Sequence, residues 1–319
     1  MTNNLESKVI EGLNSSDSMN KDYSVKSSDD SYFGRFKQGF NSFKKNIKKK
    51  ILPVVLGGVL LYGGVSCDLS NPYNVSETQD REDKIVILMN TDLPSADTYL
   101  DSYESLDSTK ITLIRDANYN SEDIYVLGHD PTNLQFENYR QLTRDNLVDL
   151  MQEINEKYSS DAFLMINSIG HAGLIDITGD SNPDCFLTNF YDGPYYSYEY
   201  PDLVYSFLRD DRRVLLNINK CYAGYVIDAF VKNPKDNVLV FASSKKDEET
   251  IERSFFDWIE RSFDNRLSKY YDLNDDNILS GQEVFDRIDS ILGPAYSRGT
   301  PQMWVKNTTD PSEFIIKKL

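Results

Sequence analysis

Residues 162–173 read AFLMINSIGHAG, and residues 214–224 read VLLNINKCYAG. Each stretch begins with a run of mostly apolar, uncharged residues, which is typical of a strand buried on both faces of a parallel sheet. Each then ends in a short turn that contains glycine. Apolar runs of the same kind predict strands at residues 84–89, 110–114, 124–127, 162–167, 214–219 and 237–242.

The segments between these strands favour helices. The clearest helix begins after Thr143, a good N-cap residue. One face of it carries Leu147, Leu150, Met151 and Ile154. Strands that alternate with helices predict a mostly parallel sheet, because parallel neighbours need a crossover connection. We therefore expect residues 84–319 to form an α/β domain, a three-layer sandwich whose central sheet is covered by helices on both faces.

A histidine and a cysteine follow two of the predicted strands. His171 lies in the turn after residues 162–167, and Cys221 lies in the turn after residues 214–219. In parallel sheets, reactive groups gather where the strands end at their carboxyl edge. A thiol attacks a carbonyl carbon as thiolate, and a nearby imidazole can take its proton and later protonate a leaving amine. The pair therefore predicts nucleophilic catalysis at this edge.

Each of these residues has a structural alternative. A cysteine at a strand end is often a small buried apolar residue, and a lone histidine is often a hydrogen-bonded loop residue, as we expect for His129. The joint pattern favours catalysis, because both residues follow a strand and precede a nearby glycine. The three cysteines, Cys67, Cys185 and Cys221, are too few for a disulfide framework and lack the spacing of a zinc site.

The order of these motifs resembles the caspase-fold cysteine peptidases, and within them the legumain-like group. In that superfamily one strand ends in a His-Gly element, and a later strand ends in Cys-x-Ser/Ala-Gly. In the caspases the histidine precedes the cysteine by about 50 residues, and here His171 and Cys221 are 50 residues apart. Shorter matches lie at residues 90–104, 242–244 and 300–302. The resemblance covers residues 84–305.

This resemblance implies a caspase-like fold and a cysteine endopeptidase that hydrolyses peptide or protein substrates. It makes Cys221 the nucleophile and His171 the general acid and base. The oxyanion hole and the substrate pocket then fall to Ala172, Gly173, Asn219 and Ser243, with the backbone amide of Cys221 as a further oxyanion donor.

Two positions depart from the family pattern. Ala172 stands directly after the histidine, where relatives have glycine, and an alanine there is strained if the position needs a positive φ. Asn219 stands two residues before Cys221, where legumain-like relatives carry an acid. The sequence therefore leaves two alternatives open: a transamidase that uses the same acyl-enzyme, and a catalytically inactive, calcium-dependent binding module.

A calcium loop is predicted at residues 272–283, DLNDDNILSGQE, which follow the spacing of an EF-hand loop. Its ligand positions are Asp272, Asn274, Asp276, the carbonyl of Ile278, Ser280 and Glu283. Calcium takes six to eight oxygen ligands, and this spacing wraps such oxygens around one centre. Asn277 replaces the usual glycine at position 6, where asparagine tolerates the left-handed conformation better than most residues. We predict a single structural Ca²⁺ site.

The charge of the chain argues against a nucleic-acid partner. The formal net charge is −17 over 319 residues. Residues 1–50 hold ten of the 34 basic residues and only six of the 51 acidic ones, so the remainder is more acidic than the chain as a whole. An acidic surface repels phosphate backbones, and we expect no binding of nucleic acid.

The N-terminal residues predict contact with a membrane. Residues 1–32 are polar, lack apolar periodicity and are expected to be a disordered tail. Residues 33–50 combine lysines with aromatic residues at helical spacing. A basic amphipathic segment of this kind suits an anionic membrane surface.

An apolar segment follows. Residues 51–67 are uncharged and end at Cys67, which predicts a signal anchor, a transmembrane helix or a lipoprotein-type segment. Residues 68–83 are a polar linker. The basic run before the apolar segment orients it with its start in the cytoplasm. We therefore expect membrane contact through residues 33–66 and an extracytoplasmic catalytic domain.

Overall fold

The computed structural model describes residues 83–96, 99–129, 136–209, 211–250, 254–292 and 299–319. The chain divides into two units, residues 1–77 and 78–319, and every described residue belongs to the second. The predicted tail, basic segment and apolar segment, residues 1–67, lie outside the described residues. The predicted linker lies outside them as well, apart from Asp83.

No helix within the described ranges is both long and apolar enough to cross a lipid bilayer. This finding overturns the prediction of a membrane-anchored chain with a transmembrane helix and an extracytoplasmic catalytic domain. The longest of the described helices is α4 (Tyr99–Ala117). Although it has 19 residues, charged side chains such as Glu104 and Arg115 line its exposed side.

Seven strands form the central sheet, in the order β11-β9-β8-β4-β1-β2-β3. All neighbours run parallel except β11, which is antiparallel to β9. The strands are β1 (Lys84–Asn90), β2 (Ile124–Gly128), β3 (Tyr139–Gln141), β4 (Phe163–Ile169), β8 (Arg213–Asn219), β9 (Val238–Ala242) and β11 (Gln302–Val305). The central strands β1, β4 and β8 are buried along almost their whole length, as expected of a parallel sheet covered on both faces.

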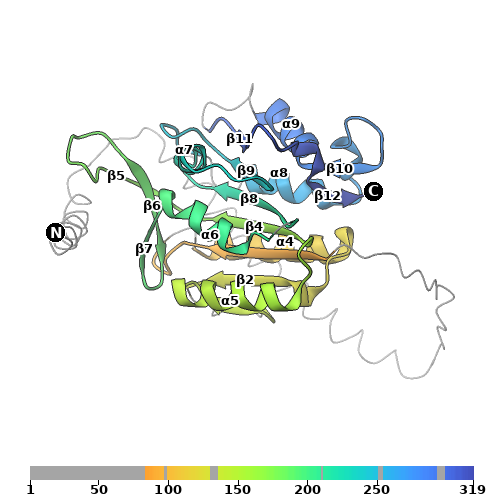
Figure 1. Ribbon diagram of the computed structural model, residues 1–319, viewed down its shortest axis with the longest axis horizontal. Coiled ribbons are helices and arrows are strands. Elements are labelled where there is room, and N and C mark those ends of the chain that lie inside the picture. The colour runs from red at the N-terminus through yellow and green to blue at the C-terminus, as the bar shows by residue number, and fades with distance from the viewer. Residues whose placement is uncertain (1–82, 97–98, 130–135, 210, 251–253, 293–298) are drawn as a thin grey trace, which may run out of the picture. The chain divides into compact units, whose positions relative to one another are not determined.

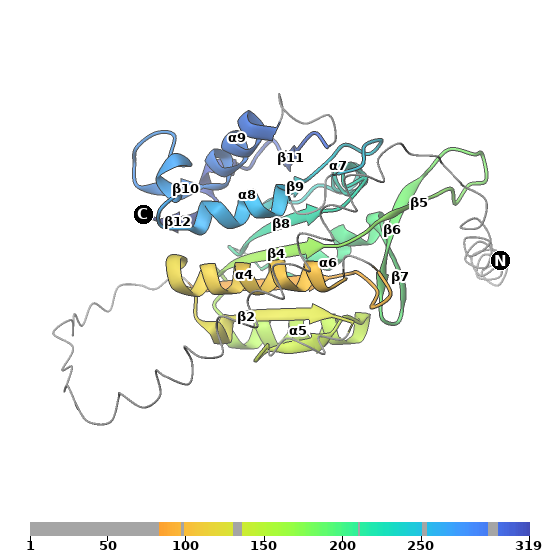
Figure 2. The ribbon, with the colours of Figure 1, turned by 180° about the vertical axis from the view of Figure 1, so that it is seen from behind.

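Helices cover both faces of this sheet (Figure 1). The first face carries α5 (Arg144–Lys157), α6 (Tyr200–Phe207) and α7 (Gly224–Lys232). The opposite face, turned to the viewer in Figure 2, carries α4, α8 (Ser254–Phe263) and α9 (Gly281–Leu292). Successive strand residues point to opposite faces, so β4 gives Leu164 and Ile166 to one core and Phe163 and Met165 to the other. The predicted three-layer α/β sandwich is confirmed.

One predicted strand is helical. Residues 110–114 belong to α4, where Ile111 and Ile114 are exposed and Leu113 is buried. This spacing places a single face on the sheet, as a helix does, and the short apolar run alone did not distinguish the two cases. The other predicted strands are confirmed as β1, β2, β4, β8 and β9. The predicted helix is confirmed as α5, and the hydroxyl of its N-cap Thr143 accepts a helix amide at 3.1 Å.

Two small sheets accompany the central one. The first is antiparallel and consists of β5 (Gly173–Ile175), β6 (Cys185–Phe190) and β7 (Gly193–Tyr196). The second pairs β10 (Ile278–Ser280) with β12 (Ile315–Lys318), also antiparallel. Because β5 begins two residues after His171, the first small sheet starts at the carboxyl edge of the central one.

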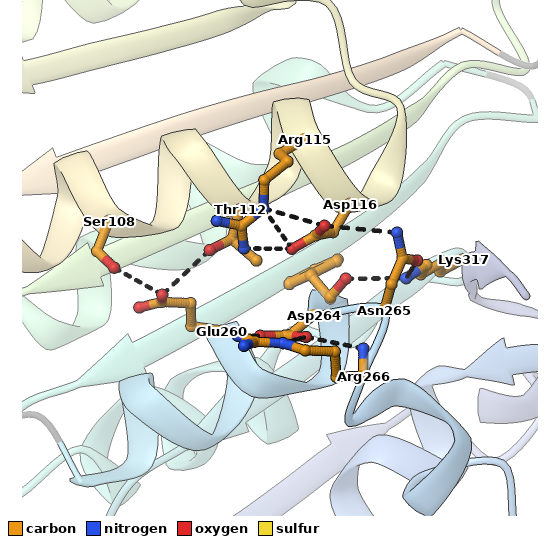
Figure 3. A network of polar contacts seen from close by, with 10 residues as sticks. Ser108, Thr112, Arg115, Asp116, Glu260, Asp264, Asn265, Arg266 and Lys317 are labelled. Atoms are coloured by element: carbon orange, nitrogen blue, oxygen red, sulfur yellow. Dashed lines mark hydrogen bonds and ion pairs between the residues drawn. The ribbon is translucent and has the colours of Figure 1, made fainter.

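A polar network joins α4, α8 and the C-terminal strand β12 (Figure 3). The carboxylate of Glu260 on α8 accepts hydrogen bonds from Ser108 at 2.7 Å and from Thr112 at 3.2 Å, both on α4. Lys317 of β12 donates to a carbonyl at the end of α8 at 2.8 Å and to Asn265 Oδ1 at 2.7 Å. The network therefore fixes β12, and through it β10, to the helices on this face.

Candidate active site

The turns that carry His171 and Cys221 leave the sheet side by side. β4 and β8 are parallel neighbours, and Ile169 pairs with Asn219 at the last position of their register. His171 and Cys221 each follow two residues later. Because adjacent strands lie about 4.8 Å apart, the two predicted turns begin side by side at the carboxyl edge. His171 is exposed there and Cys221 is half-buried.

Two serines hold the turn that precedes the cysteine. The carbonyl of Lys220 accepts hydrogen bonds from the hydroxyls of Ser243 at 3.0 Å and Ser244 at 3.2 Å. The amide of Lys220 also donates to Ser243 Oγ at 3.1 Å, and the amide of Ala223 donates to Ser244 Oγ at 3.1 Å. Ser243, predicted as a pocket residue, is buried and uses its hydroxyl on this backbone. The end of β9 thereby positions Cys221.

The backbone is strained directly after the cysteine. Tyr222 has a φ of +62°, a conformation that is costly for a residue with a Cβ. Its amide donates to the carbonyl of Glu248 at 2.8 Å, which holds the residue in place. The thiol of Cys221 lies 3.9 Å from the carbonyl oxygen of Thr250. Since α7 begins at Gly224, Cys221 lies in a sharp strand-to-helix turn beneath the loop 245–250.

The His171 turn is bonded to the end of β1. The amide of His171 donates to Asp92 Oδ1 at 2.6 Å, and the hydroxyl of Thr188 on β6 donates to the carbonyl of His171 at 3.2 Å. Gly170 has a φ of +129°, which L side chains rarely adopt. Both backbone groups of His171 are therefore fixed by side chains, one from the segment after β1 and one from β6.

The glycine requirement falls before the histidine and not after it. Ala172 does not have a positive φ, and it packs against the edge of the core. Gly173 starts β5, is exposed, and would have open space around a Cβ. The strain expected at Ala172 therefore does not arise, and Gly170 makes the tight turn instead.

Four polar side chains lie beneath the two turns, and sequence reasoning missed two of them, Thr91 and Thr188. Thr91 and Asp92 follow β1, Thr188 lies on β6, and Lys220 precedes the cysteine; all four are almost fully buried. The signals of these groups in the sequence are only local. Thr91 and Asp92 are polar residues close behind an apolar strand, and Lys220 directly follows the uncharged run 214–219. Their mutual contacts depend on the sheet order, which the sequence did not specify.

Asn219 lies at the end of β8, and its side chain is buried. Its side chain is 3% exposed, and its Oδ1 has no hydrogen-bond partner among the described residues. The alternation along β8 places it on the same face as Asn217, whose amide donates to Asn167 Oδ1 on β4. This part of the site is therefore neutral and polar, where an acid was expected from the family resemblance.

Two other titratable residues behave as structural groups. His129 is buried, its Nε2 lies 3.1 Å from the carbonyl of Asn189, and burial lowers its pKa. Cys185 on β6 is buried, and burial raises the pKa of its thiol to about 11. A thiol with this pKa is almost wholly protonated at neutral pH, so Cys185 makes a suitable internal reference for Cys221.

The predicted calcium loop adopts the required backbone turn. Asn277, at position 6, has a φ of +63°, so asparagine does take the left-handed conformation. The carboxylate of Asp272 accepts amide hydrogen bonds from Asp276 at 3.2 Å and Asn277 at 3.0 Å, which closes the loop. Asn274 Oδ1 also accepts from the amide of Asp276, at 2.9 Å. The side chains at positions 1 and 3 therefore direct oxygens toward the loop interior.

The end of the loop is held by Glu283 and by β12. Glu283 is buried in the first turn of α9, and its carboxylate accepts amide hydrogen bonds from Leu273 at 2.9 Å and Ser280 at 3.0 Å. The described residues contain no group of three His, Cys, Asp or Glu side chains placed around a metal centre. Calcium, however, also accepts amide, hydroxyl and carbonyl oxygens, which supply half of the positions here. The oxygen-only donor set fits calcium.

No protein-family model matches the chain, and no curated protein matches it. Among solved structures, the chain is similar to the crystal structure of a protein from Geobacter sulfurreducens that was a structural-genomics target. The sequence identity is 15%, the TM-score is 0.46, and the match covers 74% of this chain and 97% of that chain. A likeness at this level carries no information about activity.

A side chain at Gly170 should destabilise the fold, whereas one at Gly173 should not. A Cβ at Gly170 would lie 2.7 Å from both Asp92 Oδ1 and Thr91 Oγ1, in addition to its positive φ. Gly170→Ala is therefore expected to lower the free energy of unfolding by about 2 kcal/mol or more. Denaturant unfolding measures this, with Gly173→Ala as the matched control. Equal losses in the two variants would contradict the geometry of the turn.

Proposed function

We propose that residues 84–319 form a caspase-fold, legumain-like cysteine peptidase, which hydrolyses peptide bonds with Cys221 as nucleophile and His171 as general acid and base. One observation carries the proposal. The two turns leave adjacent parallel strands from the register pair Ile169 and Asn219, at the edge where such sheets place their reactive groups. The sharp turn after Cys221 supports it, because strained backbone clusters at functional sites.

The reaction follows from the two side chains. The imidazole of His171 takes the thiol proton, and the thiolate sulfur of Cys221 attacks the carbonyl carbon of the peptide bond. The tetrahedral intermediate collapses as the C–N bond breaks, and the imidazolium gives its proton to the leaving amine. A water molecule then attacks the thioester while the imidazole takes one of its protons. The acid product leaves, and the proton returns to the thiol.

The negative charge on the substrate oxygen needs hydrogen-bond donors in this scheme. The backbone amides of Gly173 and Cys221 are the proposed donors, because both belong to the two turns that meet at the edge. Ala172, between the histidine and Gly173, has an unstrained backbone and leads into β5. Asn219 supplies a neutral, buried polar group beneath the pocket.

Two related functions use the same surface. A transamidase would differ only in the group that attacks the thioester, an amine in place of water. A catalytically inactive binding module would keep the fold without a reactive thiol. The neutral Asn219 favours that alternative over a legumain-type pocket, whereas the held and strained turn at Cys221 favours an enzyme.

A second proposal concerns the calcium loop. We propose that residues 272–283 bind one Ca²⁺ as a structural clamp, with Asp272, Asn274, Asp276, the Ile278 carbonyl, Ser280 and Glu283 as ligands. The left-handed Asn277 and the buried Glu283 support this assignment. Strand β10 of the loop pairs with β12 at the end of the same chain, so the described loop is completed within the chain and not by a second loop.

Loss of either member of the pair should abolish cleavage while the fold survives. Cys221→Ala and His171→Ala are each expected to lower kcat/KM by several orders of magnitude, because residues that act as a unit fail together. Cleavage of a peptide library, read by mass spectrometry, measures the loss, and circular dichroism checks the fold. His129→Ala is the control and should keep most of the activity. Equal losses for the two histidine variants would contradict the assignment.

Alkylation separates an enzyme from an inactive module. In a Cys67→Ser background at neutral pH, iodoacetamide should modify Cys221 much faster than Cys185, because Cys185 is buried and its pKa is about 11. Peptide mapping of the folded protein gives the two rates. If Cys221 reacts no faster than Cys185, the peptidase and transamidase proposals both fail.

Calcium should raise the melting temperature through Glu283. A ligand that binds only the folded state stabilises it by about 3 kcal/mol at a roughly hundredfold excess over its Kd. Glu283→Gln should remove most of the difference between melting curves in calcium and in EGTA, whereas Asp289→Asn, an exposed acid on the same helix, should not. Identical melting curves of the unaltered protein in calcium and EGTA would contradict the site.

A further inference from the structure

Lys220 is a buried lysine between two parts of the candidate site. It lies between Asn219 and Cys221 and is 1% exposed. Its backbone is held by the serines after β9, so its side chain extends from a fixed point. Moving an amine out of water is costly unless the protein supplies hydrogen-bond acceptors. The acceptors that Lys220 uses are therefore informative.

Two threonine hydroxyls accept hydrogen bonds from the amine, and both donate hydrogen bonds to the His171 turn. Nζ donates to Thr91 Oγ1, whose own hydroxyl donates to the carbonyl of Ile169 at 3.1 Å. Nζ also donates to Thr188 Oγ1 at 3.4 Å, whose hydroxyl donates to the carbonyl of His171 at 3.2 Å. An ammonium group can only donate hydrogen bonds, so each threonine hydroxyl accepts from it. The hydroxyl hydrogen of each threonine is then donated to the carbonyl of Ile169 or of His171.

The two carbonyls reached in this way lie on either side of Gly170. On the amide side of the same turn, Asp92 accepts from the His171 N–H at 2.6 Å and from the Ser102 hydroxyl at 2.6 Å. The turn is therefore bonded through its amide to a buried carboxylate and through two carbonyls to a buried amine. The amine belongs to the residue that precedes Cys221, so the two turns are joined by side chains as well as by the sheet.

We propose that the amine of Lys220 is a positioning group, which holds the His171 turn against the Cys221 turn through Thr91 and Thr188 and stabilises the thiolate of Cys221 with its charge. This inference rests on the proposed pairing of His171 and Cys221. It assigns to Lys220 no contact with substrate.

Among the described residues, two groups that can carry a negative charge act on the amine of Lys220. Burial lowers its pKa to about 7, while the negative charges of Asp92 after β1 and of the Cys221 thiolate oppose this shift. The contact to the amine from β6 comes from the uncharged hydroxyl of Thr188, whereas Ser243, after β9, bonds only to the backbone of Lys220. Because coupling between two titrating groups is reciprocal, a charged Lys220 favours the thiolate as much as the thiolate favours a charged Lys220.

Lys220→Met tests the role in the full-length chain, in a Cys67→Ser background. Of the two cysteines that remain, Cys185 is buried, so alkylation then reports on Cys221. Methionine keeps an apolar stem but has no donor and no charge. The rate of Cys221 alkylation by iodoacetamide, measured across neutral pH, should shift to higher pH by about one unit, which is a roughly tenfold loss of rate on the acid side. Lys232→Met, an exposed lysine on α7, is the matched control and should keep the original profile.

A second variant separates positioning from charge. Thr188→Val keeps the shape of the side chain but breaks the link to the His171 carbonyl, and it leaves Lys220 itself in place. We expect kcat for peptide cleavage to fall about tenfold or more, with the pH profile of alkylation unchanged. This variant also supplies a test if Lys220→Met does not fold.

The outcomes distinguish this inference from the proposed function. A Lys220→Met protein that alkylates with the original pH profile overturns the electrostatic role, and a Thr188→Val protein with unchanged kcat overturns the positioning role. A melting temperature that falls while both readouts stay constant would show that Lys220 is only structural. Failure of the unaltered protein to cleave any peptide contradicts the peptidase, and the alkylation profile then decides on Lys220 alone.

Discussion

The register between β4 and β8 determines where the two turns of the candidate site lie. It sets Ile169 opposite Asn219 and so brings the turns of His171 and Cys221 to the same height at the carboxyl edge. A slip of one residue would exchange the faces of every side chain in the strand. Both cores would then lose their apolar contacts, because β4 and β8 contribute buried residues to each. The packing that stabilises the domain therefore also fixes the geometry of the site.

Buried polar groups complete what the register begins. Strand pairing ends at Ile169 and Asn219, and beyond it the two turns are held by side chains from elements distant in sequence: Asp92, Thr188 and the serines after β9. Each such group would be costly if it were left unbonded, so the turns gain a single, well-defined arrangement. The proposed calcium loop does not depend on these contacts, because it is fixed by the pairing of β10 with β12.

The sequence predicted the layers, the central strands and the two turns, because long apolar runs and glycine turns are local signals. It failed where the signal was short or depended on distant contacts. Residues 110–114 were predicted as a strand because a run of only five residues is too short to show the period of a helix. The strands β5, β6 and β7 are short and partly polar, and they were not predicted. The contact between Lys220 and Thr91 spans 129 residues and follows only from the sheet order.

An acyl-enzyme forms only if Cys221 acts as a nucleophile on the substrate carbonyl. A peptide substrate mixed with the full-length protein, quenched in acid and mapped by mass spectrometry, should carry the N-terminal part of the substrate as a thioester on Cys221. In His171→Ala the same adduct should be absent or greatly reduced, because the thiol then lacks its base. Cleavage of the peptide without acylation of Cys221, or with an acyl group on another residue, would contradict the account.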